Sequence, residues 1–211
     1  ARQTADSLGL IKEGWNGFNV LHTAASRVGG LDAGFVPGGG GLDRDGILAG
    51  AQSGRVEMVY LLGADEIDTS KLGKAFVIYQ GHHGDKGAHR ADVILPGAAY
   101  TEKDAIYVNT EGRVQLARRA AWPVGEARED WSIVRALSAQ LGKTLPFDSL
   151  AQLRSQLVAA NPVFAGIDRI KPAEWAPFGR AGEVGSAAFV SPIDNFYMTD
   201  PISRASPTMA R

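Results

Sequence analysis

The chain has 211 residues, 45% hydrophobic and 21% charged, which is the composition of an ordinary globular protein large enough for a core of its own. Its formal net charge of −1 gives no electrostatic reason to expect a nucleic acid or an acidic membrane surface as a partner. It contains no cysteine, which excludes disulfides, thiolate nucleophiles and cysteine-bound zinc or iron–sulfur clusters from this segment.

Two further features concern how the chain is placed in the cell. The longest apolar run is far shorter than the roughly 20 residues that a membrane-spanning helix needs, so we expect no direct membrane insertion. The chain begins Ala-Arg-Gln, without a signal-peptide pattern. We therefore expect it to be a piece of a longer protein.

The first periodic pattern predicts an amphipathic helix over residues 15–28. Its apolar residues recur at spacings of three and four, and they would pack on a core: Trp15, Phe18, Leu21, Ala25 and Val28. Gly29-Gly30 predicts the end of this helix.

A run of four glycines at 38–41 follows Pro37. Exposed backbone N–H groups in such a run suit a phosphate, so a phosphate-binding loop is one interpretation. However, the run lacks the Lys-Ser/Thr of a P-loop and does not directly follow a strand pattern. We favour a plain flexible loop.

Three short apolar runs predict the strands of a parallel sheet, at residues 58–62, 76–79 and 93–95. Each run is continuous, which is typical of strands that are buried on both faces. The connections between them are about a dozen residues long, as a parallel crossover requires and a hairpin does not. The sequence therefore predicts an α/β fold.

Each predicted strand ends in a small or polar cluster, and the carboxyl ends of parallel strands line the crevice where ligands bind in open α/β sheets. The second cluster holds His82, His83 and Asp85, with His89 nearby. Adjacent histidines in extended backbone point to opposite sides, and no His-x-x-x-His spacing is present, which argues against a metal. General acid–base use remains open because the ordinary histidine pKa suits neutral pH.

A second candidate set lies in a predicted hairpin whose strands are residues 107–109 and 114–116. Its turn holds Asn109, Glu111 and Arg113. One interpretation is a clamp in which Arg113 holds a phosphate or a pterin edge. The other, which we favour, is that these side chains stabilise the turn itself.

Two more amphipathic helices are predicted downstream. The first carries Trp131 and Leu141 on its apolar face and ends at Gly142; the second begins with a cap at Asp148 and stops before Pro162. Beyond residue 161, six prolines interrupt every possible run and isolated aromatic residues remain. We divide the chain into an α/β domain at 1–160 and an irregular tail at 161–211.

Several motifs resemble a known family. The segment ADVILP at 91–96, Thr101-Glu102-Lys103 and YVNTEGRVQ at 107–115 are similar to the signature of molybdopterin oxidoreductases. More closely, residues 79–115 and the tail FYMTDPISRASPTMA at 196–210 resemble the large iron–sulfur subunit of respiratory complex I, also known as the G or seventy-five-kilodalton subunit. The resemblance covers residues 15–211, and the tail is its more discriminating part.

The resemblance implies a doubly wound, mostly parallel sheet with flanking helices that has lost its organic cofactor. It implies no cofactor and no metal in this segment, and 4Fe-4S and 2Fe-2S clusters in an amino-terminal part. The partners implied are other peripheral-arm subunits, on the cytoplasmic side of a bacterial inner membrane or the matrix side of the mitochondrial one. Ala105-Ile106 departs from the Gly-Thr of working molybdenum enzymes, which weakens any pterin role for Asn109, Glu111 and Arg113.

The function expected from this resemblance is that of a redox-inactive scaffold in NADH:quinone oxidoreductase, with His82, His83, Asp85, Asn109, Glu111 and Arg113 as a vestigial crevice and no catalytic residue. The alternative is a fragment of an active molybdopterin-dependent oxidoreductase such as a formate dehydrogenase. A stand-alone nucleotide-binding module is a third hypothesis, which the missing phosphate fingerprint disfavours.

Overall fold

The computed structural model describes residues 1–24, 27–172, 174–183 and 185–209. Its helices and strands in chain order are α1 (Arg2–Ser7), β1 (Ile11–Lys12), β2 (Trp15–Asn16), α2 (Arg27–Asp32), α3 (Arg44–Gln52), β3 (Met58–Leu62), β4 (Phe76–Gly81), α4 (Lys86–Arg90), β5 (Val93–Pro96), β6 (Ala105–Val108), β7 (Val114–Ala117), α5 (Asp130–Gln140), α6 (Leu150–Ala160) and α7 (Pro201–Ala205). Four short 3-10 turns join them: η1 (Thr69–Leu72), η2 (Tyr100–Glu102), η3 (Pro162–Ala165) and η4 (Phe196–Met198).

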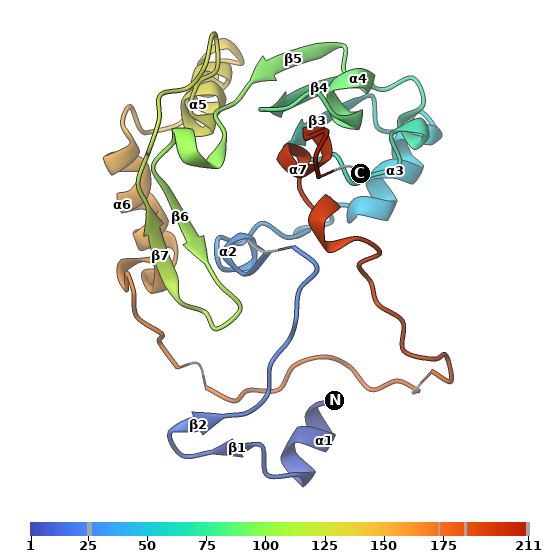
Figure 1. Cartoon of the computed structure of the whole chain (residues 1–211), viewed down its shortest axis with the longest axis vertical. Helices are drawn as coiled ribbons and strands as arrows, with labels where there is room; N and C mark the ends of the chain where they lie inside the picture. The colour runs from blue at the N-terminus through green and yellow to red at the C-terminus, as the bar shows by residue number, and fades with distance from the viewer. Residues whose placement is uncertain (25–26, 173, 184, 210–211) are drawn as a thin grey trace.

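The three predicted strands form a parallel sheet in the order β3-β4-β5 (Figure 1). Val59 pairs with Val77, and Tyr79 pairs with Ile94. The connections run through η1 and α4, as the lengths of the linking segments predict. The α/β fold with a parallel sheet is therefore confirmed.

One face of this sheet carries the first core. Val59, Leu61, Val77 and Tyr79 point to this face and pack with residues of α3 and η1, namely Leu48, Ala51 and Leu72. A progressive strand order with right-handed crossovers places the connecting segments on the same side of the sheet. The first core therefore lies between the sheet and the layer of α3, η1 and α4.

The opposite face corrects the expectation that these strands are buried on both faces. Burial alternates along β3, and Met58 and Leu62 are 61% and 51% exposed, while the neighbouring Phe76 is 43% exposed. The continuous apolar runs reflect this second, apolar but open face, because the linking segments of this chain all pack on the first.

The predicted hairpin is confirmed as β6 and β7, which pair antiparallel with Val108 opposite Val114. These two valines and Phe164 form the second core, against which Leu157 of α6 and residues of α2 pack. Gly112 has a φ of +80° in the connecting turn, a conformation that favours glycine. Figure 1 shows two halves of the molecule side by side, with the hairpin, α5 and α6 in one half and the parallel sheet in the other.

Two predicted helices exist as α5 and α6, with one correction at a boundary. The cap of α6 is Ser149, whose hydroxyl accepts a hydrogen bond from the Gln152 N–H at 3.2 Å. Asp148, the expected cap, instead accepts a hydrogen bond from Arg135 at 2.6 Å. Asp148 and Ser149 both have side chains that can cap a helix. Arg135 of α5 binds Asp148, and Ser149 caps α6.

The helix predicted over residues 15–28 is wrong. Trp15 belongs to the small β1/β2 hairpin, and Phe18 packs with Trp175 and Phe178 of the tail at ring-centroid distances of 5.3 and 5.5 Å. Phe18 therefore packs on a segment that is distant in the sequence, and the spacing of apolar residues carries no information about such contacts. Ala25 of that pattern lies outside the described residues.

The glycines around this region also behave differently from the prediction. Gly29 and Gly30 lie inside α2 rather than ending a helix. The run at 38–41 forms a tight turn, with a Gly41 N–H···O=C Gly38 hydrogen bond of 2.8 Å, and leads into α3. That helix was not predicted, although Asp43 caps it by accepting from the Gly46 N–H at 2.8 Å.

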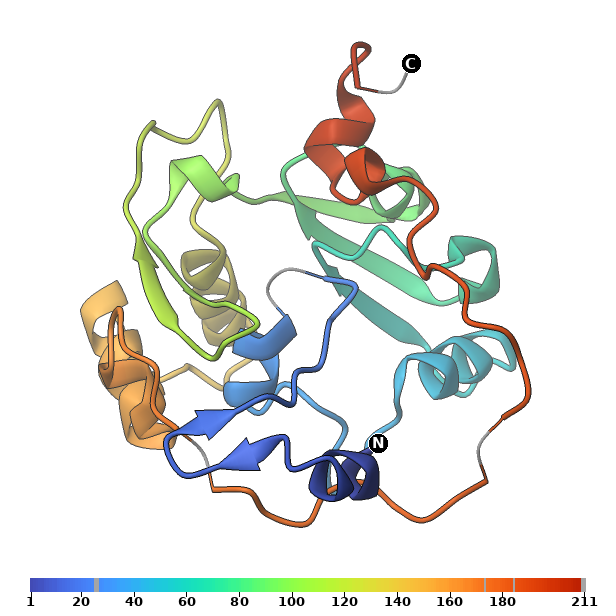
Figure 2. The same cartoon turned by 60° about the horizontal axis from the view of Figure 1, so that its bottom comes forward.

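The tail forms a strap across the molecule (Figures 1 and 2). It leaves the second core at Phe164, passes the amino-terminal segment and returns to the parallel sheet through η4 and α7. Pro162 and Pro201 each stand in the first turn of a short helix, where the missing N–H costs nothing. The expectation that prolines interrupt every run in the tail is therefore wrong at these two positions.

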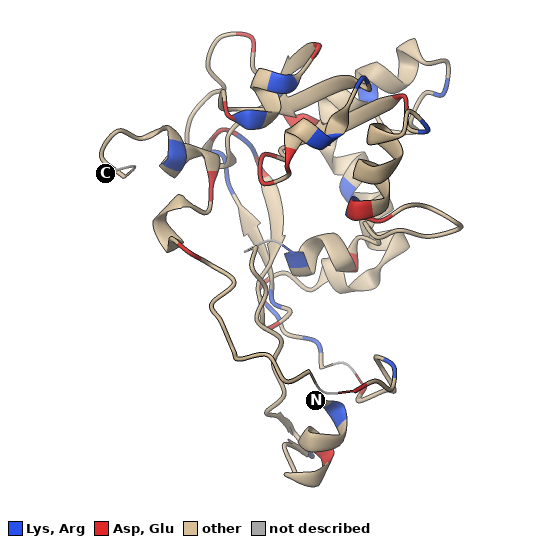
Figure 3. Ribbon diagram, turned by 90° about the vertical axis from the view of Figure 1, so that its right-hand side faces the viewer, with Lys and Arg blue, Asp and Glu red and all other residues tan. Residues whose placement is uncertain are grey.

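Charged residues of both signs are interspersed along the chain (Figure 3), in keeping with its small net charge. Among the described residues, no helix is long and apolar enough to cross a membrane.

Phe164 tests whether the start of the strap is part of the second core. The side chain is only 4% exposed, so we expect Phe164→Ala to lower the free energy of unfolding by about 3–5 kcal/mol. Phe189, which is fully exposed in the same tail, is the matched control, and Phe189→Ala should change this free energy by no more than about 0.5 kcal/mol. Equal effects of the two substitutions in a denaturant titration would refute the packing role.

Candidate functional site

The ends of β3 and β4 form the candidate site, which we call the strand-end crevice: Asp65, Glu66, His82, His83 and Asp85. The segment after β3 is joined to β4 and α4 by hydrogen bonds, since the Gly63 N–H donates to the Gln80 carbonyl of β4 at 2.8 Å and the Gly87 N–H of α4 donates to Asp65 at 2.9 Å. Parallel pairing therefore brings the first two predicted clusters together, as the sequence predicted.

Asp65 is the buried carboxylate of the crevice, with only 3% of the residue exposed. Its second oxygen accepts a hydrogen bond from the Tyr79 hydroxyl at 3.0 Å. Burial, and then the hydrogen bond to the Asp65 carboxylate, raise the pKa of Tyr79, so this hydroxyl keeps its proton and acts as a donor. A Cβ at Gly87 would lie 2.7 Å from both Asp65 and the Tyr79 ring, which is why this position needs glycine.

The two histidines face each other, which corrects the expectation that they point to opposite sides. Their Nδ1 atoms are 2.7 Å apart and their rings meet edge to face. The backbone bends at His82 and His83 instead of continuing the extended strand, and this turns both rings to one side.

The short distance decides what the pair can do. One Nδ1 must donate and the other accept, so at least one ring is neutral. Two nitrogens bound tetrahedrally to one zinc ion, each about 2.0–2.1 Å from it, would lie about 3.3 Å apart. Within the described residues, no group of three or more His, Cys, Asp or Glu side chains could hold a metal ion.

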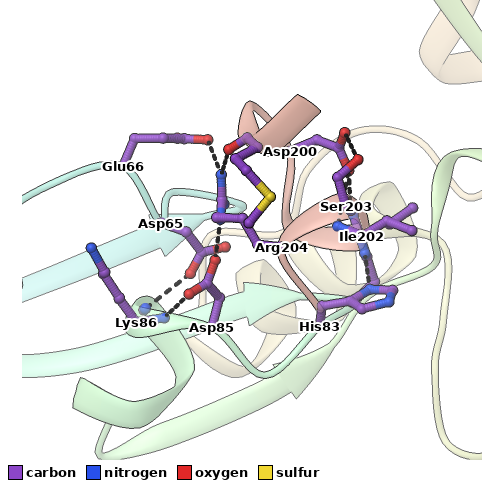
Figure 4. Close-up of polar contacts among 12 residues, drawn as sticks. Asp65, Glu66, His83, Asp85, Lys86, Asp200, Ile202, Ser203 and Arg204 are labelled. Atoms are coloured by element: carbon purple, nitrogen blue, oxygen red, sulfur yellow. Dashed lines mark hydrogen bonds and ion pairs between the residues drawn. The ribbon is translucent and has the colours of Figure 1, made fainter. Parts of the chain in front are cut away.

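Asp85 joins the crevice to the end of the chain. It caps α4 by accepting from the Lys86 N–H at 2.8 Å, and it also accepts a hydrogen bond from the Arg204 guanidinium of α7 (Figure 4). Burial acts to raise the pKa of Asp85, but the bonds from Arg204 and Lys86 and their positive charges outweigh it and hold this pKa below its ordinary value. Asp85 is therefore a carboxylate engaged on two sides.

A second polar network ties the sheet to α5. The Gln80 side chain is fully buried, accepts from the Tyr60 hydroxyl and donates to Asp130 at 2.9 Å. Asp130 also pairs with Lys103. Each buried polar group of this network thus has a partner within the chain, as stable cores require.

The second candidate set is placed elsewhere. Asn109, Glu111 and Arg113 lie at the turn of the β6/β7 hairpin, away from the ends of the parallel strands (Figure 1). The Asn109 side chain accepts from the N–H groups of Glu111 and Arg113, each at 3.0 Å. Arg113 donates to the Asp168 carbonyl at 2.9 Å and lies 3.4 Å from Glu111. These contacts match the turn-stabilising interpretation.

Sequence reasoning missed Glu66 of the crevice and, above all, Arg204, which contacts the crevice from the tail. The available signal was Asp200-Pro201, because an Asp cap followed by proline in the first turn is a typical helix start. Asp200 accepts from the Ile202 and Ser203 N–H groups at 2.9 and 3.0 Å. That helix places Arg204 in its last turn. No local signal indicates that it meets Asp85.

The pH dependence of stability tests the histidine pair. Burial, then the positive charges of His83 and Lys103, lower the pKa of His82 from 6.5. The unfolded chain therefore takes up this proton at a higher pH than the folded chain, and stability falls as the pH drops below about 6.5. We expect His82→Asn to flatten the decrease of the thermal midpoint between about pH 7.5 and about pH 5.5. An unchanged slope in the variant would contradict the desolvated pair.

Comparison with known proteins identifies the family. Residues 1–140 match the family model described as molybdopterin oxidoreductase, and residues 169–211 match that of the C-terminal region of the G subunit of NADH-ubiquinone oxidoreductase. The second match falls on the tail, which carries Arg204.

Three curated relatives are similar over almost the whole chain. They are the mitochondrial 78 kDa subunit of NADH-ubiquinone oxidoreductase from Neurospora crassa, 48% identical over 96% of this chain; the G subunit of NADH-quinone oxidoreductase from Rickettsia bellii, 43% over 98%; and NADH dehydrogenase [ubiquinone] iron-sulfur protein 1 from Solanum tuberosum, 44% over 96%. The chain covers only 27%, 29% and 27% of their lengths. The resemblance predicted from the sequence is confirmed, and the chain belongs to the molybdopterin oxidoreductase family.

Proposed function

We propose that this chain is a redox-inactive scaffold within the large iron–sulfur subunit of NADH:quinone oxidoreductase, respiratory complex I. The subunit as a whole carries electrons from NADH toward quinone through 4Fe-4S and 2Fe-2S clusters held outside this cysteine-free segment. The similarity to the bacterial G subunit and to the mitochondrial 78 kDa subunit over more than nine-tenths of the chain supports this assignment.

The observation that carries the scaffold role is the internal use of the crevice. Asp65 accepts from Gly87 and Tyr79, Asp85 accepts from Lys86 and Arg204, and the two histidines bond to each other. A ligand of this site would have to compete with these contacts within the protein.

The residues present do not fit the organic cofactor that the family implies. A molybdopterin carries phosphate, and an anion binds where N–H groups or cationic side chains converge. The crevice instead presents three carboxylates, Asp65, Glu66 and Asp85, and the guanidinium that reaches it, Arg204, comes from the tail and is paired with Glu66 and Asp85. Arg113, the other proposed contact, is engaged at the hairpin turn. We derive no catalytic step from this site.

The proposed scaffold lies in the peripheral arm, on the cytoplasmic side of a bacterial inner membrane or the matrix side of the mitochondrial one. Its tail provides a surface for neighbouring subunits. Apolar side chains of the tail are left uncovered by this chain, with Phe189 fully exposed, Val190 83% and Phe196 73%. Aromatic residues of this kind are enriched at the centres of protein interfaces.

The rival function is that of an active molybdenum or tungsten oxidoreductase. Metal analysis of the purified complex that contains the full-length subunit separates the two. We expect iron in stoichiometric amount and molybdenum and tungsten only in traces, because the crevice has no place for the cofactor. A stoichiometric amount of either metal, measured by mass spectrometry in the same sample, would overturn the scaffold assignment.

A pair of substitutions tests the docking role of the tail. We expect Phe189→Ser with Val190→Ser to reduce incorporation of the full-length subunit into the complex about tenfold, through loss of an apolar anchor. Leu141→Ser is the matched control, since Leu141 is 71% exposed at the end of α5, away from the tail. Quantitative native electrophoresis gives the incorporated fraction, and circular dichroism shows that the variants fold. Normal incorporation of the tail variant would refute docking by these residues.

A further inference from the structure

We propose that the strand-end crevice is a guanidinium-binding site that the chain closes with its own carboxy-terminal segment, and that Arg204 is its occupant. This assigns a ligand of defined chemistry to the crevice. It also assigns the end of the tail to an intramolecular contact, distinct from the exposed residues 189–190 upstream.

The first step is that the tail presents Arg204 in a fixed orientation. Asp200 caps α7 through the Ile202 and Ser203 N–H groups, and its other oxygen accepts from the Ser203 hydroxyl at 2.8 Å. Pro201 fixes the backbone of the first turn. The guanidinium also donates to the Met198 carbonyl at 3.2 Å, which holds η4 and α7 together around it. These local contacts thus orient the Arg204 side chain independently of its contact with Asp85.

The second step is the contact itself. The Arg204 Nε donates to Asp85, and Nη1 lies 3.6 Å from Glu66 (Figure 4). The side chains of Arg204 and Asp85 are each only 20% exposed, and 119 positions separate the two residues. Desolvating two charges is costly, so a pair of this kind forms where the surrounding structure holds both partners in place.

The third step is the charge of the crevice. Asp85 and Glu66 contact the Arg204 guanidinium directly, and Asp65 is a third carboxylate of the same site, with its two oxygens accepting from Gly87 and Tyr79. Lys86 is the first residue of α4 and follows Asp85 directly, but its ammonium group points away from the guanidinium (Figure 4). An arginine offers five donors in a rigid fork to such a group of acceptors, whereas a phosphate would meet like charge. The site is therefore built for a cation.

The contact has a consequence for the whole tail. Phe164 holds its start in the second core, the Trp175 indole N–H donates to Asp6 at 2.8 Å in the middle, and Arg204 holds its end at the sheet. Three separate anchors tie the strap to both halves of the molecule. Any ligand of the crevice would have to displace α7.

Hydrogen exchange on the full-length subunit tests the proposal. We expect Arg204→Gln to make the amides of Ile202, Ser203 and Arg204 exchange about tenfold faster, as loss of a partly buried charged hydrogen bond would. Asp85→Asn should have a similar effect, because asparagine keeps the cap of α4 but loses the charge. The double variant should exchange no faster than either single one, since both remove the same pair.

Two controls make the outcome decisive. Arg180→Gln changes an exposed arginine of the same tail and should leave α7 exchange unchanged. Arg204→Lys keeps the charge and should restore part of the protection. The restoration is only partial because lysine has a single ammonium group in place of the Nε and Nη1 donors that face Asp85 and Glu66. Protection of the β3 and β4 amides reports whether each variant is folded.

The proposal fails if Arg204→Gln accelerates α7 exchange no more than Arg180→Gln does. It also fails if the effects of Arg204→Gln and Asp85→Asn add, because additivity means that the two residues act independently. Metal content and incorporation into the complex test the scaffold assignment. The hydrogen-exchange results do not depend on either, so the failure of one proposal can be told from the failure of the other.

Discussion

The parallel pairing of β3, β4 and β5 is the constraint on which the rest of the molecule depends. It places the ends of β3 and β4 at one edge of the sheet, and with them Asp65, His82, His83 and Asp85. The same strand order puts α3, η1 and α4 on one face, where the first core forms, and leaves the apolar residues of the other face open. Both the crevice and the open face follow from this one arrangement.

In an enzyme with this architecture, the polar edge of the sheet would be the place for a ligand. In this chain the polar side chains at that edge make hydrogen bonds within the protein. Gln80 joins β4 to Asp130 of α5, Tyr79 joins it to Asp65, and Asp85 joins it to Arg204 of α7. Buried polar groups specify a unique packing only when each has its partner. The crevice thus connects the sheet to elements that are distant in sequence.

The sequence predicts those parts of the fold that are determined locally. The strands 58–62, 76–79 and 93–95, the hairpin around Gly112 and the helix after Asp130 all have periodic or turn signals of their own. The helix predicted over 15–28 failed because Phe18 packs on Trp175 and Phe178, across more than 150 residues. The side chains of His82 and His83 were misplaced because strand alternation was extended into a bend. Asn109, Glu111 and Arg113 could be recognised as turn residues, because their partners lie within a few positions.

Arg204 shows what sequence reasoning on one chain cannot reach. Asp200-Pro201 indicates the short helix that carries it, but its partner Asp85 is 119 positions away. Nothing in the spacing of either residue indicates the other. The contact between the tail and the strand-end crevice therefore had to come from the structure.

The central claim is that the crevice is filled by protein and not by a cofactor. A side-chain-resolution electron cryomicroscopy map of the complex that contains the full-length subunit tests this most directly. The account predicts density for the Arg204 guanidinium between Glu66 and Asp85, continuous with α7. Density for an organic ligand at the ends of β3 and β4, with the tail displaced from them, would contradict it.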